Sequence, residues 1–430
     1  MTPVSWLAMT PVTCTDIVGS MTSRCQPGRS TVIAVSGAAG SGKSTLGRTL
    51  ATTLRAPLLD LDTLTNPLLD GLHGPVLTEH WLTGEHRSTI RDARYAALRA
   101  TAAEVAGTAG TVVLVAPFTA ELTGGPEWEA LAAAVAPAEL RMVHLRGDAE
   151  LFARRRSARA EPRDAYRPAD AAPTGTGPAP PAAPHLAVDA ELSPAQQELR
   201  VLRALGMRTA VDPDAPVFTR TFDAVLSDLD GVLADSTASV VRSWDRFARE
   251  LGAPPAAVHG NHGRPARMLV EALVDPDGVE EGLRRIEAIE VADATGVEPV
   301  PGARELMASL PGDRVAVVTS GTPAIAGARL HAAGIAPPAV LVTADDVRHG
   351  KPDPEPYLLA ARRLGVDPAR CLVLEDAPAG VAAARAAGCA VVGVLGTVGA
   401  GELAEADLVV DGLDRLRVSA GADGLSVTPA

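Results

Sequence analysis

The stretch FDAVLSDLDGVLADS, residues 222–236, decides how the second half of this chain folds. It opens with a short apolar run that ends in Asp228, and Asp230 follows two positions later. Short buried runs of this kind are typical of strands in a parallel sheet. Two carboxylates at the carboxyl end of a strand can serve as nucleophile and general acid/base around one bound cation. The stretch therefore predicts a strand that carries catalytic groups.

Further short apolar runs follow towards the end of the chain. They are RVAVVTS (314–320), AVLVT (339–343), CLVLED (371–376), AVVGVL (390–395) and DLVV (407–410). Between the first two runs of the half lie amphipathic helical patterns, such as TASVVRSWDRFARELG and GVEEGLRRIEAIEVADA. So much helix between consecutive strands indicates an inserted helical cap at about residues 237–298.

The first half also alternates short apolar runs with helical segments. Its runs are TVIAVS (31–36), PLLDL (57–61), TVVLVA (111–116), LRMVHL (140–145) and HLAVD (185–189). This alternation implies a parallel sheet with right-handed crossovers. We therefore predict an α/β protein with two doubly wound parallel-sheet domains. The expected parts are a poorly structured start (1–27), a first domain (28–207), a linker (208–220) and a second domain (221–430).

A glycine-rich loop, SGAAGSGKST, follows the first strand of the first half at residues 36–45. It satisfies the G-x-x-x-x-G-K-[ST] pattern and precedes a helical segment. In that context backbone N–H groups and the helix N-terminus cradle phosphates, the lysine reaches the β/γ oxygens, and the serine can hold Mg²⁺. We expect ATP at this loop, held by Gly37, Gly40, Gly42, Lys43, Ser44 and Thr45, with Ser44 also on Mg²⁺.

The first half resembles small P-loop kinases of the shikimate-kinase type over about residues 28–207. The stretch LLDLD places Asp60 and Asp62 after the second strand, and the resemblance implies that they face the acceptor hydroxyl and the metal. An arginine-rich helix resembles the lid of those kinases and would clamp the transferring phosphoryl group. Its arginines are Arg154, Arg155, Arg156, Arg159 and Arg163. The third strand departs from many P-loop proteins because VVLVAP ends without an acidic residue.

The second half carries a constellation of motifs in a fixed order. After Asp228 and Asp230 come Thr319, Ser320 and Gly321 at the end of a strand, Lys351 in GKPDP, and Glu375 with Asp376 in LEDAPAG. This order resembles the haloacid dehalogenase superfamily of phosphatases and phosphomutases over about residues 220–415. A chance match to all of these motifs together is far less probable than a match to any one of them.

The resemblance implies a role for each motif residue. Asp228 attacks phosphorus and forms an aspartyl phosphate, while Asp230 protonates the leaving alcohol and later activates water. Thr319 holds phosphoryl oxygens together with backbone N–H groups near Ser320 and Gly321. Lys351 neutralises charge between the nucleophile and the phosphate. The resemblance also implies an Mg²⁺ site formed by Asp228, the backbone carbonyl of Asp230, Asp376 and Glu375.

The predicted cap contains a candidate substrate loop, HGNHGRPARMLVEAL. It resembles the substrate loop of sugar and sugar-alcohol phosphatases, with His262, Gly263 and Arg264 as the matching residues. One cap loop must face the substrate when such a lid closes. The alternative is a polar interhelical loop in which Pro265 begins a helix.

Charge and composition limit the classes of partner. The formal net charge is −13, and residues 214–430 hold 31 acidic against 19 basic side chains. An acidic half repels a nucleic acid backbone, so we expect no nucleic acid partner. No run approaches the roughly 18 apolar residues of a membrane helix, and no secretory signal is evident, so we expect a cytoplasmic protein without a membrane partner. Cys14, Cys25, Cys371 and Cys389 lack metal-ligand spacing.

Lysine is rare in this chain, because 37 of the 39 basic residues are arginine. The two lysines are Lys43 in the glycine-rich loop and Lys351 in GKPDP. A compact ammonium fits as a point charge against phosphate where a planar guanidinium does not. Both positions are therefore predicted to contact phosphate.

The sequence favours a Mg²⁺-dependent phosphatase for a small sugar or polyol phosphate, fused to an ATP-binding domain that resembles a small-molecule kinase. Three alternatives stay open at this point. One is a sugar phosphomutase resembling β-phosphoglucomutase. Another is an end-processing enzyme resembling polynucleotide kinase-phosphatase, against which the cap and the acidic charge count. The third makes the first half a nucleotide-sensing module without turnover.

Overall fold

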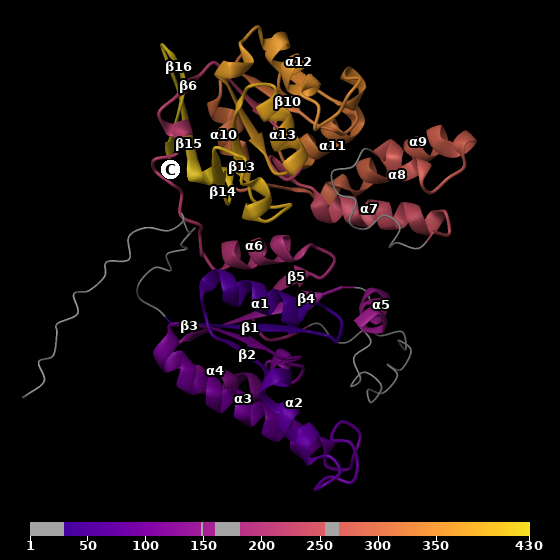
Figure 1. The fold of residues 1–430 in the computed structure, drawn as a ribbon, viewed down its shortest axis with the longest axis vertical. Coiled ribbons are helices and arrows are strands. Elements are labelled where there is room, and N and C mark those ends of the chain that lie inside the picture. Colours follow the sequence, from indigo (N-terminus) through magenta and orange to yellow (C-terminus); the bar gives the residue numbers. More distant parts are fainter. Residues whose placement is uncertain (1–29, 148, 160–180, 254–265) are drawn as a thin grey trace, which may run out of the picture.

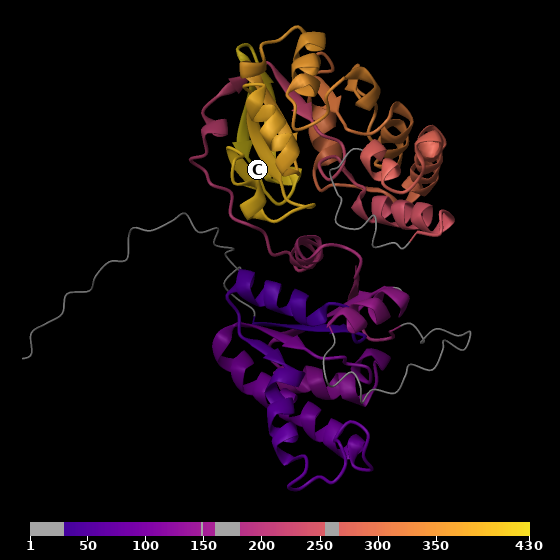
Figure 2. The same cartoon turned by 45° about the vertical axis from the view of Figure 1, so that its right-hand side comes forward.

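The computed structural model describes residues 30–147, 149–159, 181–253 and 266–430. Within these ranges the chain forms two parallel sheets with helices on both faces, which confirms the predicted fold class. Figures 1 and 2 show the first half below the second, with helix α6 (Pro194–Ala204) between them. No described helix is both long enough and apolar enough to cross a bilayer.

The first sheet has the strand order β2-β3-β1-β4-β5, and all its pairs are parallel. Its strands are β1 (Thr31–Gly37), β2 (Leu58–Asp60), β3 (Thr111–Val115), β4 (Glu139–Arg146) and β5 (His185–Asp189). Its helices are α1 (Lys43–Leu54), α2 (Leu61–Leu72), α3 (Arg87–Ala109), α4 (Pro126–Val135), α5 (Ala149–Arg159) and α6. Each predicted run of this half became one strand.

Alternate residues of β1 face the two layers of helices. Val32 packs in a core with Leu98 of α3, whereas Ile33 packs in another core with Leu46 of α1 and Val201 of α6. Successive side chains of a strand point to opposite faces of the sheet. A continuous apolar run such as TVIAVS is therefore what a strand covered on both faces requires.

The second sheet has the order β11-β10-β7-β12-β13-β14 and is also entirely parallel. Its strands are β7 (Ala224–Ser227), β10 (Val315–Val318), β11 (Val340–Val342), β12 (Cys371–Glu375), β13 (Ala390–Val394) and β14 (Leu408–Val410). The covering helices are α10 (Ala303–Ser309), α11 (Pro323–Ala332), α12 (Glu355–Leu364) and α13 (Pro378–Ala386). β7 lies between β10 and β12, so the motifs that follow these three strands come together.

A helical cap is inserted between β7 and β10. It contains α7 (Thr237–Glu250), α8 (Ala266–Glu271) and α9 (Val279–Asp293). The chain enters and leaves it through β8 (Ala234–Asp235) and β9 (Glu298–Pro299), which pair antiparallel. Trp244, Phe247, Val270 and Ile286 belong to a core of the cap itself. The cap thus packs as a separate helical unit on a two-stranded stem.

The end of the chain forms a hairpin that the sequence analysis did not predict. β15 (Leu416–Gly421) and β16 (Gly424–Pro429) pair antiparallel, and β16 also pairs with β6 (Thr221–Phe222). Gly424 has φ 131°, and a Cβ there would lie 2.6 Å from the carbonyl oxygen of Phe222. Glycine therefore allows the close approach of β16 to β6.

The segment predicted as a linker, residues 208–220, packs against the second half. Ala215 and Val217 are buried in a core that also contains Phe222 and Val225. Arg208 forms ion pairs with Asp411 and Asp414. This segment therefore packs along the second half, and the predicted domain boundary at 208–220 stays a prediction.

Candidate active site

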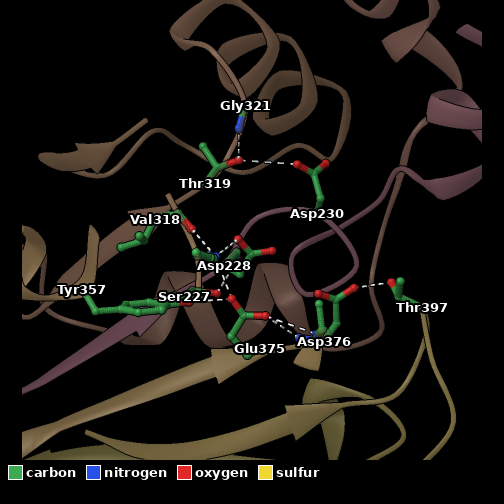
Figure 3. Close-up of polar contacts among 12 residues, drawn as sticks. Ser227, Asp228, Asp230, Val318, Thr319, Gly321, Tyr357, Glu375, Asp376 and Thr397 are labelled. Carbon is green, nitrogen blue, oxygen red and sulfur yellow. Dashed lines mark hydrogen bonds and ion pairs between the residues drawn. The ribbon is translucent and has the colours of Figure 1, made fainter. Parts of the chain in front are cut away.

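Three strands of the second sheet bring the predicted motifs to one edge (Figure 3). Asp228 follows β7, Thr319 follows β10, and Glu375 ends β12. The carboxyl ends of neighbouring parallel strands lie together, which is where ligands bind in open α/β sheets. Asp228 also takes its backbone place in this edge by donating to the carbonyl of Leu374, at 2.9 Å.

Lys351 is the cation at the centre of this edge. Its Nζ lies 2.5 Å from Oδ1 of Asp228, 2.6 Å from Oε1 of Glu375 and 3.1 Å from the carbonyl of Val318. The side chain is 8% exposed. Burial alone would lower the pKa of Lys351, but the two carboxylates outweigh it and raise the pKa. Lys351 is therefore a fixed, fully charged ammonium with three partners.

Glu375 and Asp376 are neighbours with different surroundings. Glu375 accepts from Lys351 and from the hydroxyl of Tyr357 (2.7 Å) through Oε1, and from the backbone N–H of Asp376 (3.0 Å) and of Ala377 (3.3 Å) through Oε2. A Cβ at position 380 would lie 1.7 Å from Oε1, so only glycine fits there. Both oxygens of Glu375 are already bound to protein groups, which makes Glu375 chiefly the partner of Lys351.

Asp376 presents its carboxylate beside Asp228 and is contacted by the hydroxyl of Thr397. Its pKa is raised well above the usual value, first by burial and then by the charges of Asp228 and Glu375. Gly231 makes room for it, because a Cβ there would lie 1.8 Å from Oδ2 of Asp376, and φ is 78°. The turn after Asp228 and Asp230 thus requires glycine at position 231 for two reasons, its positive φ and the close approach of Asp376.

Negative charge exceeds positive charge at this edge. Oxygens of Asp228, Glu375 and Asp376 all lie within 4.8 Å of one another, and all three side chains are buried. Burial raises the pKa of Asp228 to about 7, with Glu375 and Asp230 adding to the rise and Lys351 opposing it. A divalent cation with oxygen ligands would relieve this repulsion, so the donor set fits Mg²⁺. Asp228 and Asp376 are the residues that would hold it.

The carboxylate of Asp230 points towards Thr319 (Figure 3). Its Oδ1 accepts from the hydroxyl of Ser236 at 2.6 Å. Its Oδ2 accepts from Nη1 of Arg329 at 2.7 Å and from the hydroxyl of Thr319 at 3.4 Å. Thr319 also accepts from the backbone N–H of Gly321 at 3.0 Å. The predicted general acid/base is therefore held in one orientation.

A cavity of ≈ 240 Å³ opens above these residues, between the sheet and the cap. The predicted residues Asp228, Asp230, Ser320, Gly321, Lys351, Glu375 and Asp376 all line it. The cap contributes Val240, Trp244, Ala266 and Glu290. The volume suits a small molecule, and a polymer end would have to pass the cap. The predicted cap residues His262, Gly263 and Arg264 lie outside the described residues.

The sequence analysis missed four side chains that hold the motif residues: Ser236, Arg329, Tyr357 and Thr397. Ser236 lies in the stretch 222–236, so its contact with Asp230 could have been predicted from the sequence. Arg329 and Tyr357 lie on helices, 99 and 18 residues along the chain from Asp230 and Glu375, the residues that they contact. Their types and spacing carry no motif, so only the folded arrangement reveals them.

The glycine-rich loop lies between β1 and α1, as predicted. Gly40 and Gly42 have φ of 87° and 94°, and Gly42 caps α1. Lys43 donates to the carbonyl of Ala38 at 3.2 Å. The loop faces helix α5, where a Cβ at Gly40 would lie 2.4 Å from the carbonyl of Phe152. Ser41 Oγ is buried and has no hydrogen-bond partner among the described residues.

The loop therefore keeps the open backbone that phosphate binding needs. Gly37 ends β1, Thr45 lies in the first turn of α1, and Ser44 Oγ donates to Oδ2 of Asp60 at 3.0 Å. A hydroxyl and a carboxylate are oxygen donors of the kind that Mg²⁺ prefers. These contacts fit a nucleotide with its metal.

The predicted acceptor and lid residues differ in their contacts. Asp60 caps α2, and Asp62 pairs with Arg94 at 2.7 Å. In the lid helix, Arg155 and Arg156 donate to the carbonyls of Ala190 and Ala39.

The remaining predicted lid arginines have other positions. Arg154 pairs with Glu150 at 3.5 Å, and Arg159 ends α5 on the surface. Arg163 lies outside the described residues. Arg155 and Arg156 of the predicted lid thus contact, respectively, the residue after β5 and the glycine-rich loop.

Comparison with known proteins agrees with this geometry. Residues 222–388 match the family model of haloacid dehalogenase-like hydrolases, and residues 32–174 match that of an AAA domain. Hexitol phosphatase A of Escherichia coli (strain K12) is 40% identical over 200 residues, which cover 45% of this chain and 93% of that protein. Validoxylamine A 7'-phosphate phosphatase of Streptomyces hygroscopicus subsp. limoneus is 38% identical over 208 residues, covering 46% and 96%.

A solved hydrolase from Pseudomonas syringae is 28% identical, with coverage of 44% of this chain and 92% of that one and a TM-score of 0.40. The match to the hydrolase family is carried by the same segment that contains Asp228, Thr319, Lys351 and Asp376. Through this segment the chain belongs to the haloacid dehalogenase-like hydrolases.

Proposed function

We propose that this protein is a Mg²⁺-dependent phosphatase that hydrolyses a small sugar or polyol phosphate. The observation that carries the proposal is the buried Asp228, bound by Lys351 and set beside Asp376 at the floor of a cavity that the cap covers. Relatives that share this segment are named for phosphatase activity on hexitol phosphate, validoxylamine A 7'-phosphate and glycerol 1-phosphate. The substrate class is therefore a phosphate ester of a small polyhydroxylated molecule.

In this mechanism a carboxylate oxygen of Asp228 attacks phosphorus, and the bond from phosphorus to the ester oxygen breaks. Asp230 gives its proton to the leaving alkoxide, so the alcohol departs neutral. Water then attacks the aspartyl phosphate while Asp230 accepts a proton from it, which regenerates Asp228 and releases phosphate. Lys351 keeps the nucleophile and the phosphoryl oxygens together against their repulsion.

Bound Mg²⁺ would add charge stabilisation at the phosphoryl oxygens. On the protein side, Asp228 and Asp376 would hold it and Glu375 would hold Lys351. Thr319 lies beside Asp230, and in this proposal its hydroxyl and backbone N–H groups near Ser320 and Gly321 would hold phosphoryl oxygens. In this proposal Lys351 and the metal would neutralise charge at the floor of the cavity, and Asp230 would transfer protons.

For the first half we propose ATP binding at the loop 36–45 and phosphoryl transfer to a small acceptor. The open loop, the contact of Ser44 with Asp60, and the approach of Arg156 to the loop support this proposal. The match of residues 32–174 to an AAA domain supports nucleotide binding. The acceptor would lie near Asp60 and Asp62, in the direction of Arg94.

The test is a panel of sugar and polyol phosphates, assayed for phosphate release by the full-length protein with Mg²⁺, with and without ATP. We expect release from at least one polyol or sugar phosphate, and loss of release after chelation of the metal. ATP consumption that depends on an added sugar or polyol would support the kinase. Phosphate transfer within a sugar without release would overturn the hydrolase in favour of a mutase.

A further inference from the structure

Arg329 is a buried cation that the proposed chemistry does not yet use. It lies on α11 with 5% of its side chain exposed, and its two terminal nitrogens point to different parts of the molecule. Nη1 lies 2.7 Å from Asp230, and Nη2 lies 2.7 Å from Oε2 of Glu290 on cap helix α9. Burying an arginine is costly unless it is paired on each side. The contacts show that both pairs are made.

On the catalytic side, Arg329 fixes the orientation of Asp230. Ser236 holds one oxygen of this carboxylate and Arg329 holds the other. A planar guanidinium constrains a carboxylate more strongly than a single hydroxyl does, because its donors are rigid. A displacement of about 1 Å in such a group can cost on the order of a hundredfold in rate. The direction in which Asp230 presents its proton therefore depends on Arg329.

On the cap side, the same arginine meets a carboxylate that is itself held in place. Glu290 is buried, lines the cavity and is also hydrogen-bonded by Trp244 of α7. A second polar contact joins α11 to the same cap helix, from the hydroxyl of Thr322 to Glu287. Glu290 balances the charge of Arg329, so the guanidinium holds Asp230 without adding a net positive charge beside it.

We propose that Arg329 is a positioning residue that ties the orientation of Asp230 to the seating of the cap. With the cap seated, Glu290 and Asp230 hold the guanidinium between them, and Asp230 faces the leaving oxygen. With the cap away, Arg329 loses one anchor and Asp230 loses its fixed direction. The inference rests on the proposed phosphatase, because it assigns to Asp230 the transfer of a proton to the leaving group.

Leaving-group dependence tests this role in the full-length protein. An alkyl phosphate expels a poor leaving group that needs a proton, whereas p-nitrophenyl phosphate expels a phenolate that does not. General acid catalysis contributes roughly 10²–10⁴-fold where it is needed. We expect Arg329→Met to lower kcat/KM for the best polyol phosphate of the panel by about a hundredfold. For p-nitrophenyl phosphate we expect kcat/KM to fall by about tenfold or less.

Arg329→Lys keeps the charge and can reach one carboxylate at a time, so we expect it to recover part of the activity on the polyol phosphate. Equal losses on both substrates, or no recovery in Arg329→Lys, would show that Arg329 only supports the fold and would overturn the proposal. If the wild-type protein hydrolyses neither substrate, the proposed phosphatase itself has failed. The two failures are therefore distinguishable.

Two further variants complete the design. Arg285→Met removes an exposed ion pair within the cap, between Arg285 and Glu250, and should change neither rate by more than about twofold. If Arg329→Met does not fold because Glu290 is left as an uncompensated buried charge, Arg329→Met/Glu290→Gln removes both charges. This double variant should show the same selective loss on the polyol phosphate, and an equal loss on both substrates would again contradict the proposal.

Discussion

The two lysines of this chain, both predicted to contact phosphate, lie in different surroundings. Lys351 is buried between the side chains of Asp228 and Glu375 at two strand ends and the backbone carbonyl of Val318 at a third, and Tyr357 from a helix also contacts Glu375. Lys43 begins a helix, is half-buried, and contacts the carbonyl of Ala38 in its own loop. One site is built from charged side chains, and the other is built mainly from backbone groups and glycines.

The difference shows how each site prepares for an anion. In the proposed phosphatase, the catalytic carboxylates would repel an anionic substrate, and Lys351, already fixed among them, would offset that repulsion. In the proposed ATP site, the loop itself would supply N–H donors and the helix N-terminus, and Lys43 would add one charge. We therefore expect the loss of phosphatase turnover to be largest for a substitution of Asp228, smaller for Lys351 and smallest for Lys43.

The largest effect is expected for Asp228→Asn. An amide cannot form the aspartyl phosphate, so we expect phosphate release to fall by ~10³-fold or more. The substitution removes one of several mutually repelling carboxylates, so the fold should persist. Steady-state phosphate release from the best substrate of the panel measures the loss, and circular dichroism measures the fold. Retention of more than a small fraction of wild-type turnover would remove Asp228 as the nucleophile.

Lys351→Arg comes next and tests whether shape matters as well as charge. A guanidinium is broader than an ammonium, and Lys351 is already in contact with three oxygens at 2.5–3.1 Å. We expect turnover to fall by at least about tenfold, equivalent to roughly 1.4 kcal/mol of transition-state stabilisation. The measurement is phosphate release at saturating Mg²⁺.

An exposed arginine-for-lysine control is not available in this chain, because its other lysine is Lys43. The reference for Lys351→Arg is therefore Lys351→Met, which removes the charge and keeps the length. Lys351→Met should be the less active of the two. Near-wild-type turnover of Lys351→Arg would mean that positive charge alone suffices at this position, and that the rarity of lysine elsewhere in the chain is uninformative.

The residues at the strand ends were predictable from the sequence, and the buried pair of Arg329 and Glu290 was not. Asp228, Thr319 and Glu375 stand at the ends of apolar runs, and parallel pairing of those runs brings their ends together whatever the details of packing. Arg329 and Glu290 lie within helices of ordinary amphipathic pattern, where a charged residue is usually on a solvated face. That both are buried and face each other follows from how the cap seats on α11, which is a long-range property.

The final hairpin and the contacts of the linker were missed for related reasons. β15 alternates buried and exposed residues only weakly, with exposed Ser419, Ala420 and Gly421 at its end. Such a short strand is stabilised by its pairing with β16 more than by its own composition. Residues 208–220 have the proline and aspartate content of a loop, and only the burial of Ala215 and Val217 shows that they are fixed.

The smallest effect on phosphatase turnover is expected for Lys43→Ala. Loss of one charged contact to phosphate is worth about 1.5–3 kcal/mol, so ATP binding should weaken by roughly ten- to a hundredfold. Turnover without ATP should stay within about twofold of the wild-type rate, a change small enough to fall within ordinary surface effects. Lys43 contacts the carbonyl of Ala38, whereas the phosphatase groups belong to another sheet. Calorimetric titration of ATP and the phosphate-release assay measure the two quantities.

The comparison is sharpened by repeating the assay with saturating ATP, since the structure offers a route between the halves. Leu46 of α1 and Val201 of α6 share a core, and Arg203 of α6 donates to the carbonyls of Leu395 and Asp411 in the second half. The loop after Leu395 carries Thr397, which contacts Asp376. If the halves act independently, ATP changes phosphatase turnover in neither the wild-type protein nor Lys43→Ala. If ATP changes the turnover of the wild-type protein but not of Lys43→Ala, without being consumed, the first half is a nucleotide sensor that acts through α6, and the proposed kinase is wrong.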